Sequence, residues 1–308
     1  MNFGYEDRRA SFSGDLGSVC RIVLDDAAAS DLLPERDESG DKTAFGNALV
    51  IAGSAGCTGA PFFSATACQR CGAGLVRLAV PSEIHAIEAV KLNEVMVIPV
   101  DIDRHADIDE RSIAEYLKLA SRSDAVLAGP GISVTQNNRL LIRRLIRSSR
   151  IPLVLDADAL NCLSGDPQAL LDAQCDIVIT PHEREFTRLF SFDGVPSDDE
   201  LLGLAARYDV VVVYKSAETR IASPSGVLRV NSGAANSGMA KGGSGDVLAG
   251  MVLAFLTQGM EAEEAAALAV RLHSVAGRIA RERLTQYVML PSDVIGCFPE
   301  AFKVIMER

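Results

Sequence analysis

Short apolar runs recur along the chain, and most of them are separated by stretches with helical spacing. The runs are ALVIAG (48–53), LVRLAVP (75–81), EVMVIPV (94–100), AVLAGPG (125–131), PLVLDAD (152–158), DIVITPH (176–182) and VVVVYKS (210–216). Continuous apolar strands are typical of a sheet covered on both faces, and their alternation with helices is typical of parallel βαβ units. The pattern therefore predicts an α/β fold with a largely parallel sheet and helices on both of its faces.

The pattern changes near residue 217, where a hairpin and then two helices are predicted. The stretch TRIASPSGVLRVNS has Pro224, Ser225 and Gly226 as turn residues in its middle. Beyond it, apolar residues on one stripe predict a helix from Asp246 to about Gln258. A long, alanine-rich helix is predicted over EAEEAAALAVRLHSVAGRIARERL.

The N-terminal residues follow neither pattern. They are polar, and SVCRIVLDDAAASDLL (18–33) indicates one short helix. The remainder contains no repeat, low-complexity segment or linker that would divide it. The sequence predicts an N-terminal extension over 1–32 and a single domain over 33–308.

Composition and charge narrow the classes of function. The chain has 308 residues, 48% of them hydrophobic, and no apolar run approaches the about 20 residues that cross a bilayer. The first residues, MNFGYEDRRASFSGD, lack the apolar core of a signal peptide, so a cytoplasmic protein without a membrane partner is expected. A net charge of −11 disfavours nucleic acid, although local backbone N–H groups can still hold a small anion.

The cysteines give little sign of metal or redox chemistry. Seven are spread along the chain, and the only close pair is Cys68-x-x-Cys71, in the helical stretch PFFSATACQRCGAG. A second pair or a nearby histidine would be needed to complete a zinc site. Reduced thiols and no metal site are expected.

The stretch GMAKGGSGDVLAG (238–250) places a glycine turn directly before a predicted helix. Glycines let the backbone approach a ligand closely, and a helix N-terminus presents unpaired N–H groups to an anion. The segment 241–245 therefore predicts an anion pocket, to which Lys241 would add a cation; the P-loop order of residues is absent. Asp246 fits two roles, an N-cap of the helix or a base beside the anion pocket.

Other glycine-rich or polar motifs follow the predicted strands. If the sheet is parallel, these motifs meet at one edge, where ligands bind in open α/β sheets. Taken singly, each is explained by a turn, a helix cap or a solvated side chain. His85, His105 and His273 have no comparable setting and are expected to be structural. The strand-end motifs are GSAGCTGA (53–60), GPGI (129–132), DADALN (156–161), PHERE (181–185) and KSAET (215–219).

In this order the motifs resemble those of the ADP- or ATP-dependent NAD(P)H-hydrate dehydratase family, which has a ribokinase-like fold. The resemblance runs from about LPERDESGDK (33–42) to near the C-terminus. It rests on GSxxxxGA, GPGI, DADALN, TPHxxEF, a lysine at a strand end and AKGGSGDVLAG. The segment AKGGSGD alone is less specific, because small-molecule kinases of the same fold share a glycine turn and an aspartate.

The resemblance implies a repair reaction on the S form of hydrated NADH or NADPH. A nucleotide, ADP or ATP, phosphorylates the ring hydroxyl of the hydrate, and elimination of phosphate regenerates NADH or NADPH. Asp246 would be the base for that hydroxyl. Backbone N–H groups of Gly243, Ser244 and Gly245 would form the anion hole for the transferring phosphoryl group.

Positional match to the family implies the other site residues. Asn236 would line the site just before the glycine turn. Contacts to the hydrate would come from Ala60, Gly131, His182 and Asp246. Mg²⁺ would arrive with the nucleotide, held mainly by phosphates and water. Contacts to the adenine nucleotide would come from Gly245 and from Lys215, Ser216, Ala217, Glu218 and Thr219.

The chain departs from the family pattern at a few positions. The family commonly has Pro-Gly-Glu after the histidine, where this chain has Glu183-Arg184-Glu185. Ser216 stands where a glycine usually follows the lysine, and Ser244 replaces a usual threonine. The departures bear on nucleotide binding and on the choice between ADP and ATP.

The resemblance also implies partners. A homotetramer is the family's usual assembly. The residues before the domain are too few to hold the epimerase domain that is fused to some members. A separate NAD(P)H-hydrate epimerase is therefore expected to act with this protein.

Three alternatives use the same residues differently. A small-molecule kinase of the ribokinase-like fold, acting on a hydroxymethyl or sugar substrate, would use Asp246 alike but release a stable phosphorylated product. A nucleotide-binding protein without catalysis would account for the departures. A Rossmann dehydrogenase is suggested by GSAGCTGA, which lacks the G-x-G-x-x-G spacing.

Overall fold

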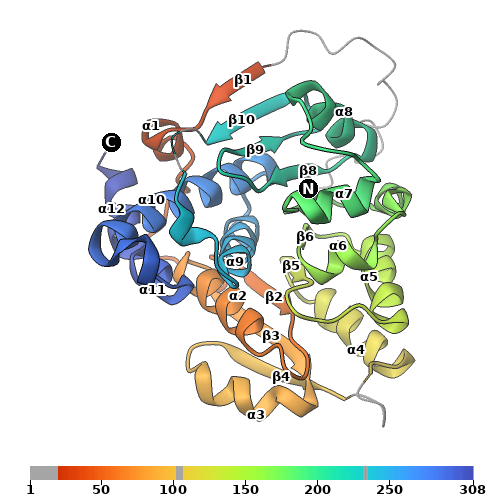
Figure 1. Cartoon of the computed structure of the whole chain (residues 1–308). Helices are drawn as coiled ribbons and strands as arrows, with labels where there is room; N and C mark the ends of the chain where they lie inside the picture. Colours follow the sequence, from red (N-terminus) through yellow and green to blue (C-terminus); the bar gives the residue numbers. More distant parts are fainter. Residues whose placement is uncertain (1–19, 102–106, 232, 234, 308) are drawn as a thin grey trace.

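A ten-stranded sheet forms the centre of the molecule (Figure 1). The computed structural model describes residues 20–101, 107–231, 233 and 235–307. Over these residues the strand order is β1-β10-β9-β8-β7-β6-β5-β2-β3-β4. The strands are β1 (Cys20–Val23), β2 (Asn47–Ile51), β3 (Leu75–Pro81), β4 (Met96–Val100), β5 (Ala125–Ala128), β6 (Leu153–Leu155), β7 (Ile177–Ile179), β8 (Val211–Tyr214), β9 (Thr219–Ala222) and β10 (Val227–Asn231).

The sheet is largely parallel, as predicted. From β4 through β2 and β5 to β8, every neighbouring pair runs parallel, and each of these strands lies in one of the predicted apolar runs. The predicted hairpin is confirmed, because β9 pairs antiparallel with β10 and also with β8. β1 pairs parallel with β10 at the edge of the sheet.

Helices cover both faces of the sheet, as predicted. Successive residues of a strand point to opposite faces, so the continuously apolar strands present hydrophobic side chains on both faces. In β2, Val50 belongs to the core on one face, and Leu49 and Ile51 belong to the core on the other. The first face carries α1 (Asp26–Ser30), α2 (Gly59–Arg70), α3 (Ser82–Lys91), α9 (Ser244–Thr257), α10 (Ala262–Val288), α11 (Pro291–Gly296) and α12 (Phe298–Met306). The second face carries α4 (Glu110–Ala120), α5 (Gln136–Ser148), α6 (Asp158–Cys162), α7 (Glu183–Phe190) and α8 (Asp198–Tyr208).

The described residues also form short 3₁₀ turns. The 3₁₀ turns are η2 (Pro167–Asp172) and η3 (Ser237–Met239). Within the described ranges, no helix combines the length and the apolar character needed to cross a membrane.

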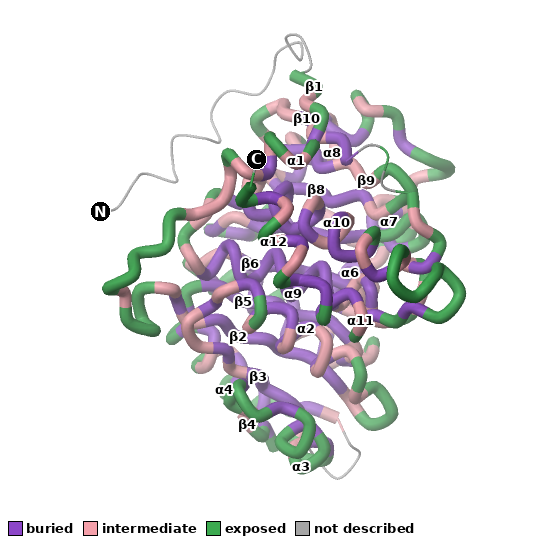
Figure 2. The backbone as a smooth tube through the Cα atoms, turned by 90° about the vertical axis from the view of Figure 1, so that its left-hand side faces the viewer, coloured by how far each residue is buried: buried purple, intermediate pink, exposed green. Residues whose placement is uncertain are grey.

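The helix α9 lies in the interior of the molecule, packed on the sheet with α2 and α10 against it. Nearly all of its residues are buried, and Figure 2 shows it as a purple segment. A Cβ placed on Gly250 would lie 2.2 Å from the carbonyl oxygen of Ser64 in α2. The backbones of α2 and α9 therefore touch at this point, and only glycine allows it.

The N-terminal segment differs from its prediction. Where one helix was expected over 18–33, the structure has the strand β1 followed by the short helix α1. The side chain of Asp25 accepts a hydrogen bond from Ala28 N (2.9 Å) and thereby starts α1, while the β-branched residues Ile22 and Val23 favour the strand. The boundary of the domain at residue 33 stays a prediction. Residues 1–19 and His105 lie outside the described residues.

We expect Gly250→Ala to destabilise the protein by about 1–3 kcal/mol, because the added methyl group would force α2 and α9 apart. Urea unfolding followed by circular dichroism measures the change. The matched control is Gly203→Ala in α8, where an added Cβ meets nothing within 4 Å. That control should gain about 0.5–1 kcal/mol from better helix propensity. Equal effects of the two substitutions would contradict the close contact of α2 with α9.

Candidate active site

The predicted strand-end motifs lie at one edge of the sheet. The strand β2 pairs with β3 on one side and with β5 on the other, so the chain order reverses between β2 and β5. Such a reversal opens a crevice at the carboxyl ends of the strands. The loops after β2, β5, β6, β7 and β8 all lie at this edge because these strands are parallel.

The loops after β2 and β5 are joined by hydrogen bonds. Gly53 N donates to the carbonyl of Pro130 (2.8 Å), and Ser54 Oγ donates to the carbonyl of Gly131 (2.8 Å). Gly131 has a φ of +67°, and a Cβ there would lie 3.3 Å from the Cβ of Ala60. The structure therefore brings Ala60 and Gly131 together, and both leave the backbone open to a ligand.

The glycine turn lies against the same end of α2. Gly243 has a φ of +102°, and a Cβ there would lie 2.7 Å from the ring of Phe63, three residues after Ala60. The turn is thus next to the loops that carry Ala60 and Gly131. The first α-helical hydrogen bond of α9 runs from Val247 N to Gly243 O (3.0 Å). Gly245 precedes Val247 in the first turn, so its N–H group has no partner within the helix, as an anion hole requires.

Asp246 lies inside α9 and is not its N-cap. It is the third residue of a helix whose N-cap is Gly243, and no side-chain cap is present there. Burial and the nearby carboxylate of Asp156 raise its pKa to about 7, although the ammonium of Lys215 opposes the shift. A carboxyl group that titrates near neutral pH is suited to accept and return a proton. Of the two roles that the sequence left open, the cap is wrong.

A buried ion pair lies beside Asp246. Lys215 Nζ donates to Asp156 Oδ1 at 2.8 Å and lies 3.9 Å from Glu185 Oε2. The side chains of Asp156 and Glu185 are only 1% and 6% exposed. Burial alone would lower the pKa of Lys215, but the carboxylates of Asp156 and Glu185 raise it overall. Burial raises the pKa of Glu185, partly offset by Lys215.

The two acids of DADALN have different contacts. Between them, Ala157 has a φ of +51°, a strained conformation for a residue with a side chain. Asp156 points to Lys215, whereas Asp158 Oδ2 accepts a hydrogen bond from Ser133 N (2.9 Å) in the loop after β5. The strained turn thus uses one carboxylate for the charge cluster and the other to hold the loop of Gly131.

His182 forms the N-cap of α7. Its Nδ1 accepts from Glu185 N (3.2 Å), and Glu185 Oε2 accepts from His182 N (2.9 Å), a reciprocal capping box. The side chain of His182 is 50% exposed. The capping box needs only the histidine and the acid three residues later. This explains why Glu183 and Arg184 can replace the family's usual residues without loss of the turn.

Asn236 and Lys241 fix the glycine stretch to the end of α10. The amide of Asn236 donates to the carbonyl of Gly277 (2.9 Å) and accepts from Gly238 N (3.1 Å). Lys241 Nζ donates to the carbonyls of Tyr287 (2.9 Å) and Met289 (2.6 Å). The ammonium that the sequence assigned to the anion pocket donates to these two carbonyls, and its contribution to the pocket stays a prediction.

The segment 215–219 forms a turn between β8 and β9. Ser216 Oγ donates to the carbonyl of Glu218 (2.6 Å), and Thr219 Oγ1 donates to the carbonyl of Ser216 (3.2 Å). Ser216, Ala217 and Glu218 are exposed. The turn therefore offers an open rim beside the buried charge cluster.

Three residues of this edge were not among the predicted site residues: Asp156, Glu185 and His273. The first two stood in strand-end motifs, but only the sheet order brings them to Lys215. His273 Nε2 is buried and has no hydrogen-bond partner among the described residues. Burial and the charge of Lys215 lower its pKa to about 4, so the imidazole is neutral. Its place in a long helix gave no signal of this neighbourhood.

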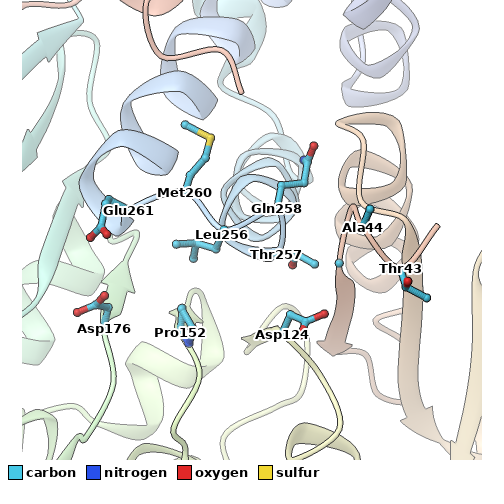
Figure 3. Close-up of a pocket in the computed structure, with 12 residues that line it drawn as sticks. Thr43, Ala44, Asp124, Pro152, Asp176, Leu256, Thr257, Gln258, Met260 and Glu261 are labelled. Atoms are coloured by element: carbon cyan, nitrogen blue, oxygen red, sulfur yellow. The ribbon is translucent and has the colours of Figure 1, made fainter. Parts of the chain in front are cut away.

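A separate pocket of about 470 Å³ lies at the opposite edge of the sheet (Figure 3). It is lined by residues that precede strands, such as Asp124, Pro152 and Asp176. These face the segment from Leu256 to Glu261, which joins the last turn of α9 to the start of α10. These residues lie at the amino ends of parallel strands. The pocket is therefore distinct from the edge that carries the predicted site.

The described residues include no group of three or more His, Cys, Asp or Glu side chains arranged to hold a metal ion. Cys68 and Cys71 are free thiols, as predicted, and both are buried. Burial raises the pKa of each thiol well above its ordinary value, which keeps them protonated and unreactive.

Fold and site together define a ribokinase-like α/β protein with a glycine turn and an aspartate at the start of a core helix. A ribokinase-like superfamily protein from Enterococcus faecalis has a TM-score of 0.78 at 25% identity, covering 94% of this chain and 97% of that one. The ADP/ATP-dependent NAD(P)H-hydrate dehydratase from Bacillus subtilis, crystallised with ATP/Mg²⁺, has the same fold. Its TM-score is 0.78 at 24% identity, covering 92% of this chain and 98% of that one.

Sequence comparison narrows the class further. The profile of the NAD(P)H-hydrate dehydratase family matches residues 48–299. An ADP-dependent (S)-NAD(P)H-hydrate dehydratase of Lactococcus lactis is 32% identical over 284 residues, covering 90% of this chain and 97% of that one. A bifunctional NAD(P)H-hydrate repair enzyme of Moorella thermoacetica is 34% identical over 292 residues, covering 94% and 55%, so this chain spans about half of that protein. The chain belongs to the NAD(P)H-hydrate dehydratase family.

We expect Asp246→Asn to stabilise the fold at pH 8 by about 1–3 kcal/mol. Folded Asp246 binds its proton more tightly than the unfolded chain does, so wild-type stability falls as pH rises through its folded pKa of about 7. The variant lacks this loss, and its advantage should shrink towards pH 4. Urea unfolding at several pH values measures the difference.

The matched control for this prediction is Asp293→Asn. Asp293 is also the third residue of a helix, α11, but its Oδ2 accepts a hydrogen bond from Leu290 N (2.7 Å). Removing that charge should not stabilise the protein at any pH. A pH-independent effect of Asp246→Asn would contradict the raised pKa.

Proposed function

We propose that the protein dehydrates the S form of NADH or NADPH hydrate, consuming ADP or ATP. The products are NADH or NADPH, phosphate and the lower nucleotide. One observation carries the proposal. Asp246, with a pKa near neutral, stands in the first turn of α9, and the glycine turn before it packs through Gly243 on Phe63, three residues after Ala60. Membership of the NAD(P)H-hydrate dehydratase family supports it.

In this proposal Asp246 takes the proton of the ring hydroxyl as its oxygen attacks the terminal phosphoryl group. The N–H groups of Gly243, Ser244 and Gly245 stabilise the charge on that group, because the start of α9 carries the positive end of the helix dipole. Ser244 N, which donates to the carbonyl of Lys241 (3.2 Å), would exchange that bond for a phosphoryl oxygen. Elimination of phosphate then restores the reduced nicotinamide. The proton on Asp246 returns to solvent, which a pKa near 7 favours.

The substrate positions follow the same geometry. The hydrate lies between the loops of Ala60 and Gly131 and the glycine turn, with His182 at its rim. The nucleotide lies along the exposed turn formed by 215–219, with its terminal phosphate towards Gly245. Asn236 contributes by holding the glycine stretch to α10.

Mg²⁺ enters the proposal with the nucleotide. A polyphosphate at this edge meets the carboxylates of Asp156, Glu185 and Asp246, and a divalent cation offsets their repulsion. Asp156 is already bound to Lys215. The cation is therefore proposed to be held mainly by phosphates and water.

Three further parts of the proposal rest on the family resemblance. The protein acts in the cytoplasm, it assembles as a homo-oligomer, with four copies as the family's usual form, and a separate epimerase converts the other epimer of the hydrate.

The test of the reaction is a turnover assay with purified protein, hydrated NADH and Mg²⁺, with ADP and ATP in parallel. We expect absorbance of reduced nicotinamide and released phosphate to rise in step with one of the nucleotides, and chelation of Mg²⁺ by EDTA to stop both. Loss of nucleotide phosphate with accumulation of a stable phosphorylated product would favour the small-molecule kinase instead. No reaction despite measurable nucleotide binding would favour a binding protein.

Asp246→Asn should lower kcat by about 10²–10⁴-fold, the range for loss of a general base, while nucleotide affinity is retained. Steady-state kinetics measures kcat, and calorimetric titration measures the nucleotide affinity. Asp199→Asn, the same substitution at an exposed position in the first turn of α8, serves as the control that keeps the base. Near wild-type turnover of Asp246→Asn would remove Asp246 from the mechanism.

A further inference from the structure

The ammonium of Lys215 faces the interior and not the exposed turn that follows it. Its side chain is 18% exposed, and Nζ donates to Asp156 Oδ1 at 2.8 Å. A Cβ placed on Gly245 would lie 3.2 Å from Nζ and 3.9 Å from Asp156 Oδ2. The ion pair therefore sits directly beneath the glycine turn. The ammonium can reach this place because Gly245 has no side chain.

Titratable groups from five elements form a cluster that contains this ammonium and the carboxylate of Asp246. Carboxylates outnumber cations, so the one ammonium decides how much negative charge the cluster can hold. The neutral imidazole of His273 adds no charge of its own. The groups are Asp156 after β6, Asp158 in α6, Glu185 in α7 with His182 before it, Asp246 in α9 and His273 in α10.

We propose that Lys215, anchored by Asp156, is a positioning residue for Asp246: its side chain sets how tightly that carboxyl group holds its proton and does not bind the nucleotide. The backbone of Lys215 still belongs to the strand end along which the nucleotide lies in the proposed function, on which this inference rests. An opposite charge nearby favours the ionised carboxylate, and a like charge disfavours it.

An anchor is needed because a lysine has a flexible four-carbon stem and its ammonium is strongly hydrated when free. Asp156 itself is held in place by the strained turn at Ala157 and by close packing with Gly129, where a Cβ would lie 1.9 Å from the carbonyl of Asp156. Glu185 is fixed by the capping box with His182. The charges around Asp246 are thus fixed before any ligand binds.

Loss of Lys215 and loss of Asp156 should shift the pKa of Asp246 in opposite directions. Lys215→Met removes the favourable charge, so Asp246 should titrate about one pH unit higher. Asp156→Asn removes a like charge and leaves Lys215 to the remaining carboxylates, so Asp246 should titrate about one unit lower. General disruption of the site would not give shifts of opposite sign.

The experiment is a ¹³C NMR titration of aspartate carboxyl groups in the nucleotide-free protein, with the Asp246 signal assigned by its loss in Asp246→Asn. The acid limb of kcat/KM against pH should move with the NMR value. The affinity for ADP should stay within about twofold in Lys215→Met, since in this proposal the ammonium stays bound to Asp156 beneath the turn. Lys118→Met is the control. Lys118 is exposed in the last turn of α4, which leads to the amino end of β5, so its loss should not move the titration.

Shifts of the same sign in both variants, or no shift in either, would overturn the proposal. So would a tenfold loss of ADP affinity in Lys215→Met with an unmoved Asp246 titration. If Lys215→Met does not fold, the double variant with Asp156→Asn leaves no unpaired half of the ion pair, and it should titrate above Asp156→Asn alone. The NMR titration does not depend on turnover, so failure of the proposed reaction and failure of this inference are told apart.

Discussion

The close contact of α2 with α9 sets the position of the glycine turn at the candidate active site. Because Gly250 has no side chain, α9 lies against the backbone of Ser64, and its first turn comes to the start of α2. There Gly243 packs on Phe63, which brings the glycine turn to the end of α2 that carries Ala60. The same burial that makes α9 a core helix also makes its N-terminus a rigid, partly dehydrated place for charge.

A core helix that carries a buried carboxyl group in its first turn, as the proposed function requires, loses stability for the sake of that function. Asp246 is held where burial opposes its ionisation, and the nearby carboxylates add to that cost. A protein optimised for stability alone would have a neutral side chain here. The buried ammonium of Lys215 beneath the turn offsets part of this cost, because it is bound to Asp156 and lies close to Glu185.

Much of the fold and part of the site could be predicted from the sequence. The continuous apolar runs identified the parallel strands, and the strand-end motifs identified the edge where Ala60, Gly131 and Asp246 meet. The pairing of Lys215 with Asp156 could not be predicted, because it depends on which strands are neighbours in space. The engagement of Lys241 by the carbonyls after α10 is equally non-local. The strand β1 was mistaken for helix because its partner, β10, is remote in the chain.

That strand has a consequence for synthesis on the ribosome. Cys20 lies opposite Val227 in the parallel pair of β1 with β10. β1 can therefore pair only after the chain has been synthesised beyond residue 227. The strands from β2 to β8 can join nearest neighbours as they appear, whereas β1 closes the sheet late. The pairing of β1 with β10 can therefore form only after both segments have been synthesised.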